Sequence, residues 1–186
     1  PRNQPLPESF AGEVLLKVGD KITTDHIMPA GARLKYRSNV ELYSQFVFEG
    51  IDSTFSRRAR ETAAKGIYGL IVAGESYGQG SSREHAALCP MYLGIKAVLA
   101  RSFERIHAAN LVNFGIMPLI LSQEDYDRIK QGDLLRFGNL TDQLSPGKPV
   151  EIINSTGNYR FSVRHDLSAR QIEIIKAGGL LNLRTG

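Results

Sequence analysis

Residues 69–85, GLIVAGESYGQGSSREH, contain the features that decide the fold. The first six form a continuous apolar run flanked by glycines, which is typical of a strand covered on both faces of a sheet. A glycine-rich turn follows at residues 78–80, and a helical stretch then runs to Leu93. Strand, glycine turn and helix therefore follow one another within about 25 residues, as they do in α/β proteins.

The same alternation continues on both sides of this stretch. Downstream, the pattern predicts strands at residues 96–100 and 116–121, with a short helix at residues 103–110 between them. Upstream, it predicts a strand at residues 13–18 and helices at residues 39–48 and 56–65. Residues 21–37 between them are polar, and we expect a long ordered loop there. Strand and helix in alternation predict a mainly parallel sheet with right-handed crossovers.

The last third of the chain has a different pattern. Residues 133–137, 149–154 and 159–163 alternate between apolar and polar and are separated by turn residues, which indicates added β structure. A final helix is expected over residues 167–177, starting near Asp166 and stopping at two consecutive glycines. The fold class is therefore α/β, with a mainly parallel central sheet and a β-rich C-terminal flank.

Prolines occupy three of the first seven positions. Because such a segment forms neither a helix nor a central strand, residues 1–10 are predicted to be an extended linker. They lack an initiator methionine, so we expect them to continue a longer chain, although processing would also account for this start. The predicted organisation is an interdomain linker at residues 1–10 and one folded domain at residues 11–186.

Composition and charge exclude several classes of protein. Of the 186 residues of the chain, 42% are hydrophobic and 23% are charged. This composition is typical of a globular protein and excludes disordered and collagen-like chains. No apolar run approaches the roughly 20 residues that span a bilayer, so we expect no membrane association. Cys89 is the single cysteine, so this chain alone forms neither a disulfide framework nor an all-cysteine metal site. A reducing compartment, the cytoplasm, is expected.

The net charge of +4 leaves the partner open. A basic balance is compatible with nucleic acid, an acidic substrate or an acidic neighbouring domain. The densest basic group lies at residues 57–65 on a predicted helix, and no recognised nucleic-acid-binding module accompanies it. Charge alone does not decide the function.

Residues 77–85 predict an anion-binding loop. Glycines let backbone N–H groups approach a ligand, and the first turn of the following helix offers unpaired N–H groups and the positive end of its dipole. Arg83 adds a forked donor suited to a planar carboxylate. In such a field the alkoxide form of Ser81 or Ser82 is stabilised, and either serine could then act as a base. The spacing is not that of a Walker loop, a dinucleotide fingerprint or a hydrolase elbow.

A structural interpretation competes with this one. Ser81 and Glu84 fit the S-x-x-E capping box, in which the serine caps the helix and the glutamate reaches back to it. The residues taken alone favour capping over catalysis.

A second polar cluster spans residues 23–26, Thr-Thr-Asp-His. Asp25 and His26 follow a strand and could orient one another or a water molecule. Arg33, Lys35 and Arg37 come next, and their charges lie on one side if the segment is extended. Both clusters lie at predicted strand ends, where α/β sheets bind ligands, and together they suit a small polycarboxylate. An ordinary solvated loop is the alternative.

Five further residues have more than one interpretation or no assigned partner. His107 could be a ligand or a base, but a helical histidine between apolar residues is more often structural. Arg105 and Asn110 could line a cleft or satisfy backbone carbonyls. His165 has no partner that the sequence identifies, and Cys89 is expected to be a buried, inert thiol.

Residues 20–31, 77–88 and 102–119 together resemble the C-terminal swivel domain of aconitate hydratase (aconitase), and residues 164–173 extend the match more weakly. The resemblance implies a swivelling-domain-like β/β/α fold. It also implies a hydro-lyase of the tricarboxylic acid cycle that interconverts citrate and isocitrate through cis-aconitate. In that family a [4Fe-4S] cluster is held by other domains, here in the same longer chain or in a separate subunit, so this domain alone would be inactive.

The resemblance also implies roles for single residues. Ser81 would be the catalytic base that takes a proton from carbon, which we favour over its capping role. Asp25 and His26 match the family's Asp–His pair, with Asp25 orienting groups of the site. Ser82, Arg83 and Arg37 would bind substrate carboxylates. No residue of this chain is expected to bind the metal cluster.

Several alternatives stay open within and outside this class. Homoaconitate, methylcitrate and 3-isopropylmalate dehydratases share the Gly-Ser-Ser-Arg-Glu-His motif with the wider superfamily. A charged residue such as Arg37 suits a third carboxylate better than an isopropyl group, but does not separate citrate from homocitrate. Gln79 and Cys89 depart from the family's usual residues without affecting the positions above. An RNA-binding module and a purely structural domain are the alternatives of other classes.

Overall fold

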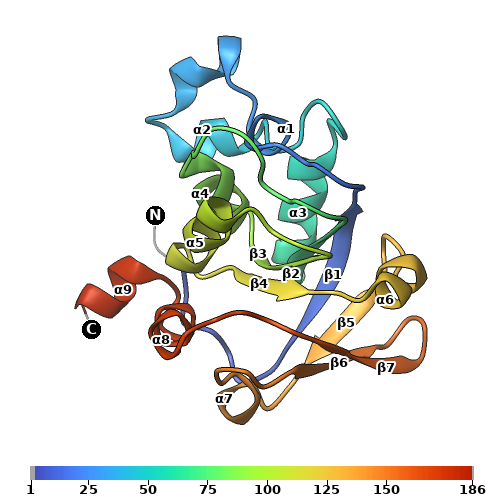
Figure 1. The fold of residues 1–186 in the computed structure, drawn as a ribbon. Coiled ribbons are helices and arrows are strands. Elements are labelled where there is room, and N and C mark those ends of the chain that lie inside the picture. The colour runs from blue at the N-terminus through green and yellow to red at the C-terminus, as the bar shows by residue number, and fades with distance from the viewer. Residues whose placement is uncertain (1–2, 186) are drawn as a thin grey trace.

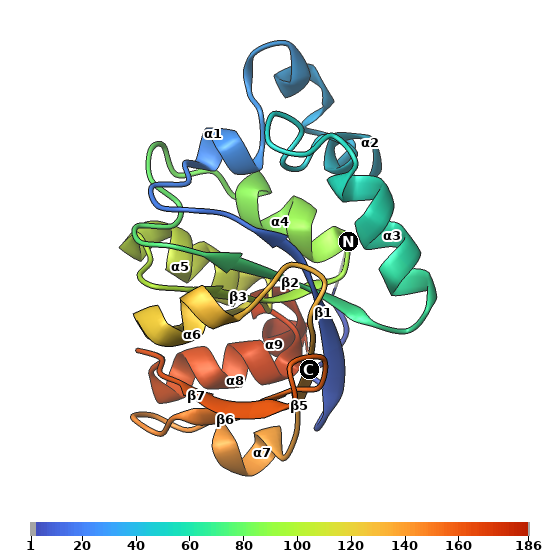
Figure 2. The ribbon, with the colours of Figure 1, turned by 90° about the vertical axis from the view of Figure 1, so that its right-hand side faces the viewer.

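A computed structural model describes residues 3–185 of the chain (Figures 1 and 2). The strands within this part are β1 (Phe10–Lys17), β2 (Tyr68–Ala73), β3 (Ile95–Ala100), β4 (Met117–Ile120), β5 (Leu134–Phe137), β6 (Val150–Asn154) and β7 (Tyr159–Val163). The helices there are α1 (Thr24–Ile27), the 3-10 helix η1 (Gly31–Tyr36), α2 (Val40–Ser44), α3 (Phe55–Ala64), α4 (His85–Tyr92), α5 (Arg105–Asn113), α6 (Gln123–Arg128), α7 (Leu140–Gln143), α8 (Ala169–Ala177) and α9 (Leu180–Thr185).

All seven strands form one sheet in the order β4-β3-β2-β1-β5-β6-β7. Strands β1 to β4 pair in parallel, and β5 to β7 are antiparallel to their neighbours, with β1 as the strand shared by both halves. This topology confirms the predicted α/β fold with a mainly parallel central sheet and a β-rich C-terminal flank.

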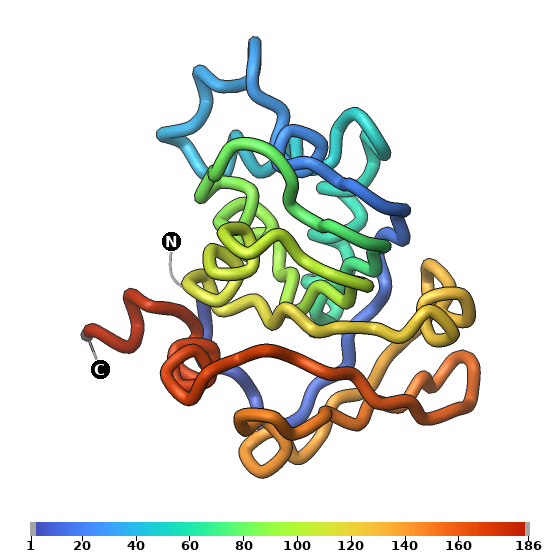
Figure 3. The backbone as a smooth tube through the Cα atoms, viewed as in Figure 1, coloured from blue at the N-terminus to red at the C-terminus, as the bar shows by residue number. Residues whose placement is uncertain are grey.

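The two ends of the sheet meet. The backbone N–H of Ile120, the last residue of β4, donates to the carbonyl of Arg164 at 2.8 Å, and the N–H of Arg164 donates back at 3.0 Å. The tube in Figure 3 shows the segment after β7 crossing beside the end of β4. The sheet is therefore curled almost into a barrel.

Alternate residues of the parallel strands pack into two separate cores. In β2, Ile71 and Ala73 belong to the core shared with helices α1 to α4. Leu70 and Val72 belong to the core shared with the antiparallel strands and helix α8. Because successive side chains of a strand point to opposite faces, both faces of β2 are covered, and this explains its uninterrupted apolar sequence.

Helix α8 shows how short signals fix an element. Ser168 caps it by accepting from the N–H of Gln171, whose side chain accepts in turn from the N–H of Ser168. The helix ends at Gly178, which has φ of 94° and therefore favours glycine. The predicted stop is confirmed, whereas the predicted start near Asp166 lies before the true cap because Ser168 supplies the stronger capping pair.

The described part of the predicted linker, residues 3–9, packs against the end of the chain. The N–H of Leu6 donates to the carbonyl of Lys176 at 3.0 Å, and the Asn182 amide donates to the carbonyl of Asn3 at 2.7 Å. Lys96 Nζ adds a bond to the carbonyl of Gln4 at 3.3 Å. Residues 1–2 lie outside the described residues, and the linker role stays a prediction.

Some predicted elements differ from the structure. Residues 21–37 contain helices α1 and η1 instead of an irregular loop, because Thr23 caps a turn of helix that polar composition hides. The helix predicted at residues 39–48 ends at Ser44 and continues as turns. Helices α6, α7 and α9 were not predicted; each has six residues or fewer. Among the described residues, no helix has the length and apolar character required to cross a membrane.

Candidate functional site

The glycine loop and the Thr-Thr-Asp-His cluster, distant in sequence, lie side by side. The N–H of Gly78 donates to the carbonyl of Ile22 at 2.7 Å, and the N–H of Thr24 donates to the carbonyl of Gln79 at 2.8 Å. Gly78 and Gly80 have φ of 96° and 97°, a left-handed backbone that glycine adopts without strain. The two polar clusters of the sequence therefore form one site.

Ser81 and Ser82 are exposed at the end of this loop. The Thr24 hydroxyl donates to the carbonyl of Ser81 at 2.8 Å and so fixes the backbone of the candidate base. The Asn110 amide of α5 donates to Ser82 Oγ at 3.4 Å. The Ser81 side chain is therefore exposed to solvent, while its backbone is fixed by the buried Thr24 side chain.

The capping box considered for Ser81 is absent. Helix α4 begins at His85, and its N-cap residue is Glu84, which makes no side-chain capping bond. The N–H groups of Ala86 and Ala87 instead donate to the carbonyls of Arg83 and Glu84 in tight turns, at 3.2 and 2.9 Å. Ser81 lies four residues before the start of α4 and therefore outside its first turn.

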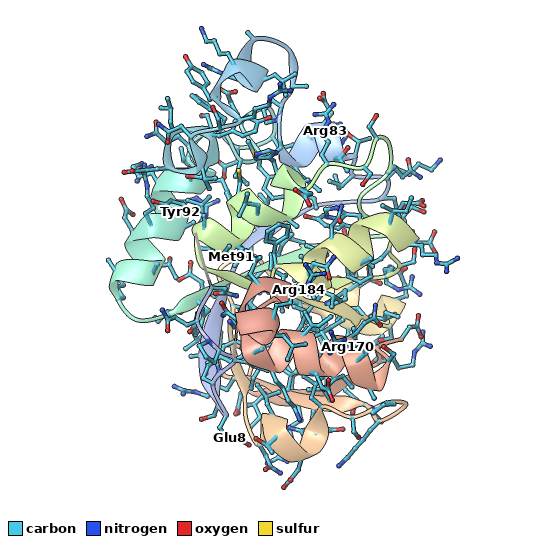
Figure 4. The ribbon with its side chains drawn as sticks, turned by 90° about the vertical axis from the view of Figure 1, so that its left-hand side faces the viewer. Glu8, Arg83, Met91, Tyr92, Arg170 and Arg184 are labelled. Carbon is cyan, nitrogen blue, oxygen red and sulfur yellow. The ribbon has the colours of Figure 1, made fainter. Side chains whose placement is uncertain are left out.

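Arg83 and Asp25 join the two clusters by an ion pair. Arg83 Nη1 donates to Asp25 Oδ1 at 3.2 Å and to the carbonyl of Met28 at 3.1 Å, and Figure 4 shows Arg83 beside the short helix α1. The Asp25 oxygen also accepts from the N–H of Ala30 at 3.2 Å. The Arg83 side chain is 27% exposed and that of Asp25 is 65% exposed. Arg83 Nε and Nη2 make no hydrogen bond with the described residues, so this edge of the guanidinium is available to a carboxylate.

His26 has a role within its own helix. Thr23 Oγ1 accepts from the N–H of His26 at 3.0 Å, and His26 Nδ1 accepts from the N–H of Thr23 at 2.9 Å, completing a capping box around α1. Since Nδ1 accepts, the proton of the neutral ring is on Nε2. His26 is exposed, and its Nε2 makes no hydrogen bond with the described residues.

Arg37 lies at the end of η1 with an exposed side chain. Its carbonyl oxygen is 2.8 Å from His85 Nε2, which ties it to helix α4. The three charges were expected on one side only if this segment is extended, and that condition is not met. A 3-10 helix has three residues per turn, so Arg33, Lys35 and Arg37 point in different directions. Arg33 pairs with Glu49 at 2.7 Å instead.

A cavity of about 380 Å³ opens beside the loop. Its lining residues are Thr24, Gly78, Gly80, Ser82, Glu104, Arg105, Ile106 and His107. Ser82 and the start of α5 therefore share one wall, while Ser81, Arg83 and Arg37 lie outside it. This arrangement forms one side of a polar site and leaves the other side open.

Two buried groups behave as the sequence suggested. His107 lies in the core against Gly78, where burial lowers the pKa of its imidazole to about 4, so the ring is neutral at pH 7. Cys89 is fully buried, and burial raises the pKa of its thiol to about 12, as expected for an inert cysteine.

The basic group on α3 is partly neutralised. Arg57 pairs with Glu61 at 3.1 Å, and Arg58 pairs with Asp52 at 2.6 Å. This face therefore presents less free positive charge than the sequence count indicates.

The donor set of this chain does not fit an iron–sulfur cluster. Across residues 3–185 no group of three or more His, Cys, Asp or Glu side chains is placed to hold a metal ion. A cluster ligated by three cysteine thiolates also cannot be built from Cys89 alone.

Comparison with known proteins shows the family to which this chain belongs. The family described as Aconitase C-terminal domain matches residues 35–124. A solved structure of 3-isopropylmalate dehydratase from Methanocaldococcus jannaschii superposes with a TM-score of 0.70 and 32% identity, covering 96% of this chain and 93% of that one. The chain belongs to the aconitase C-terminal domain family, within the superfamily that also contains the isopropylmalate dehydratases.

Relatives in sequence include several hydro-lyases. A probable mitochondrial aconitate hydratase of Dictyostelium discoideum is 38% identical over 91% of this chain, and a mitochondrial homocitrate dehydratase of Saccharomyces cerevisiae is 35% identical over 91%. The chain spans about a quarter of the length of these relatives, since it covers 25% of each.

Sequence reasoning missed three residues that shape the site. Thr24 was quoted within its motif, but nothing in the sequence places its hydroxyl beneath Ser81. His85 ends the Gly-Ser-Ser-Arg-Glu-His motif, yet it was given no role. Tyr43 was not singled out, and only its burial within an exposed segment distinguishes it.

Proposed function

We propose that this chain is the part of an aconitate hydratase that binds substrate and supplies the catalytic base, interconverting citrate and isocitrate through cis-aconitate. The observation that carries the proposal is the joining of the two polar clusters: Thr24 fixes the Ser81 backbone, and Arg83 pairs with Asp25. A serine oxygen, two arginines and an Asp–His pair thus come from three segments to one exposed edge.

Ser81 would act as the base. Its alkoxide takes the proton from the substrate carbon next to a carboxylate, forming a serine O–H bond as the C–H bond breaks. Negative charge then develops on that carboxylate, and Arg83 offers Nε and Nη2 to stabilise it. Asp25 holds Arg83 Nη1 at 3.2 Å and so orients the guanidinium. Ser82 and Asn110 would form a polar wall on the cavity side.

Arg37 would bind another carboxylate of the substrate. Its exposed guanidinium makes no hydrogen bond with the described residues, which supports a role toward a ligand. A charged group here favours a tricarboxylate over 3-isopropylmalate, because a third carboxylate pairs with the guanidinium and an isopropyl group does not. Homocitrate and methylcitrate also carry three carboxylates, so dehydration of either one is the alternative among hydro-lyases of this family. One relative is named a homocitrate dehydratase.

The [4Fe-4S] cluster would be held by other aconitase domains, in the same longer chain or in a separate subunit, because this chain lacks the thiolates. When bound there, the cluster would supply the Lewis acid for the substrate hydroxyl group. The cytoplasmic location expected from the single cysteine stays a prediction. The Dictyostelium and yeast relatives named above are described as mitochondrial, and cell fractionation would decide between the compartments.

The test is Ser81→Ala in the complete assembled enzyme, with Ser162→Ala on β7 as the control. We expect hydration of cis-aconitate to fall by at least about 100-fold in Ser81→Ala, the range of a lost general base. Iron and sulfide content and citrate binding should be unchanged. Near-normal turnover in Ser81→Ala would refute the assignment of the base. Comparing citrate, homocitrate, methylcitrate and 3-isopropylmalate as substrates of the unmodified enzyme identifies the substrate.

A further inference from the structure

The segment from Met28 to Arg37, here called the arginine arm, is held at both ends by side chains from other elements. Near its start, the Tyr43 hydroxyl of α2 donates to the carbonyl of Pro29 at 3.0 Å. At its end, His85 Nε2 of α4 lies 2.8 Å from the carbonyl of Arg37. Because a carbonyl oxygen only accepts, the His85 ring must donate this bond through Nε2–H.

The two anchoring side chains also contact one another. The Tyr43 and His85 rings pack edge to face, with centroids 5.3 Å apart and an interplanar angle of 60°. Tyr43 is almost fully buried, and burial raises the pKa of its hydroxyl, which therefore stays a donor. The pair consequently forms one packed unit with two donors, one for each end of the arm.

Nothing in the described residues holds the Arg37 side chain itself. Its guanidinium has no hydrogen-bonding partner there, whereas Arg33 in the same arm pairs with Glu49 and lies over the Phe46 ring at 4.0 Å. The point from which the Arg37 side chain leaves the arm is therefore set by its backbone. That backbone is fixed by the bond from His85.

His85 also connects the arm to the candidate base. It is the first residue of α4, and Ser81 lies four positions earlier on the same segment. Helix α4 is anchored in the core by Ala86 and Ala87, both fully buried. A single short segment therefore fixes the position of the serine and, through His85, the position of Arg37.

We infer that His85 and Tyr43 are a pair of positioning residues that preset the distance between Ser81 and the Arg37 backbone, and thereby the affinity for the substrate carboxylate that Arg37 binds. This inference rests on the proposed function, since it needs Arg37 to be a substrate-binding residue. Preorganisation of this kind lowers the ordering cost of binding, because the arm does not have to find its position when substrate arrives.

The experiment uses the complete assembled enzyme with five single variants and one double variant, His85→Phe with Arg37→Ala. His85→Phe keeps the ring and removes the donor, His85→Gln keeps a donor near the Nε2 position, and Tyr43→Phe removes only the hydroxyl. Arg37→Ala measures the full contribution of the clamp. Tyr92→Phe on the far end of α4, where the ring is 39% exposed, is the matched control for Tyr43→Phe. KM, kcat and the Kd for isocitrate are measured for each.

We expect His85→Phe to raise KM and Kd roughly three- to tenfold, the effect of one lost hydrogen bond, with kcat changed by less than about twofold. His85→Gln should restore most of the affinity, and Tyr43→Phe should weaken it in the same direction. In the Arg37→Ala background, His85→Phe should add nothing, because the two residues act through one contact.

Two outcomes overturn the inference: unchanged KM and Kd in both His85→Phe and Tyr43→Phe, or an equal loss from His85→Phe with and without Arg37. If His85→Phe does not fold, as judged by circular dichroism, Tyr43→Phe and the rescue by His85→Gln decide. Failure of the proposed function is distinguishable, because in that case Arg37→Ala alone leaves KM and Kd unchanged.

Discussion

The hydroxyl group of Thr24 donates a 2.8 Å hydrogen bond to the backbone carbonyl of Ser81, a residue 57 positions further along the chain. Thr24 is 2% exposed, whereas Ser81 is exposed. A buried side chain therefore fixes the backbone of a serine that lies at the surface. Neither motif alone defines the site, because the geometry of each depends on the other.

We expect Thr24→Val to lower the free energy of unfolding by about 1 kcal/mol, the usual net value of one hydrogen bond. The substitution keeps the shape of the side chain and removes its donor. Urea unfolding measures the change. Thr24→Ser retains the hydroxyl and should lose less; if it is destabilised as much as Thr24→Val, the methyl group and not the hydrogen bond holds the loop.

Gly78→Ala should be more destabilising than an ordinary glycine substitution. A Cβ at residue 78 would lie 2.4 Å from His107 Cβ, and φ is 96°. We expect a loss of about 1–2 kcal/mol from the backbone and about 1–3 kcal/mol more from overpacking.

Gly66→Ala is the matched control for that variant. Gly66 has φ of 77°, and a Cβ there meets nothing within 4 Å. It should therefore show the backbone cost alone. Equal losses of thermal stability in the two variants would contradict the close packing of the loop on His107.

Lys96 should make stability depend on alkaline pH. Its side chain is 1% exposed, and burial lowers the pKa of its ammonium group from 10.5 to about 8. The unfolded chain therefore binds this proton more tightly than the folded protein does. Below about pH 8 both states are protonated, and the cost of burying the charge is fully present. As the pH rises from about 8 toward 10.5, the folded protein loses the proton first and its stability increases.

Lys96→Met removes this titration. Between pH 7 and about pH 9.5 the unmodified protein should gain about 2 kcal/mol relative to Lys96→Met, which follows from the pKa difference at 1.36 kcal/mol per unit. Urea unfolding of both proteins at the two pH values measures this. A constant difference would mean that the folded-state pKa of Lys96 stays near 10.5 because its environment is wetter than its burial indicates.

His107 should contribute to acid unfolding. Its folded-state pKa of about 4 lies below the ordinary value of 6.5, so stability is fully present above pH 6.5 and is lost as the pH falls toward 4. Both ring nitrogens are buried without a partner among the described residues. His107→Leu should therefore change the free energy of unfolding little at pH 7. Between pH 6.5 and 4 the stability of this variant should fall less than that of the unmodified protein. An unchanged acid profile in His107→Leu would assign the loss to other groups.

The central elements could be predicted because their sequences carry one dominant signal. The apolar runs of β2 and β3, between glycines and turns, fit only a strand buried on both faces. The last helix carries a glycine stop at Gly178, and the structure ends it there. Short helices such as α6 and α7 carry no such signal, since four to six residues are too few for periodicity to show.

The site could be predicted by residue type but not by contact. Asp25 and Arg83 were both identified as polar site residues, yet their ion pair depends on a turn of helix that the composition of residues 21–37 concealed. Ser81 matched a capping pattern that the backbone does not use, because α4 begins only at His85 and its N-cap residue is Glu84. Local patterns do not report such long-range bonds.

The reciprocal bonds between Ile120 and Arg164 have a consequence for how this domain can meet other molecules. A sheet with free margins can recruit a strand from a neighbour through its unpaired backbone groups. Here the two margins satisfy one another where they meet. At this point no further strand can pair with the sheet, so a neighbouring molecule that approaches here has to be contacted by loops and side chains, which separate more easily than paired strands.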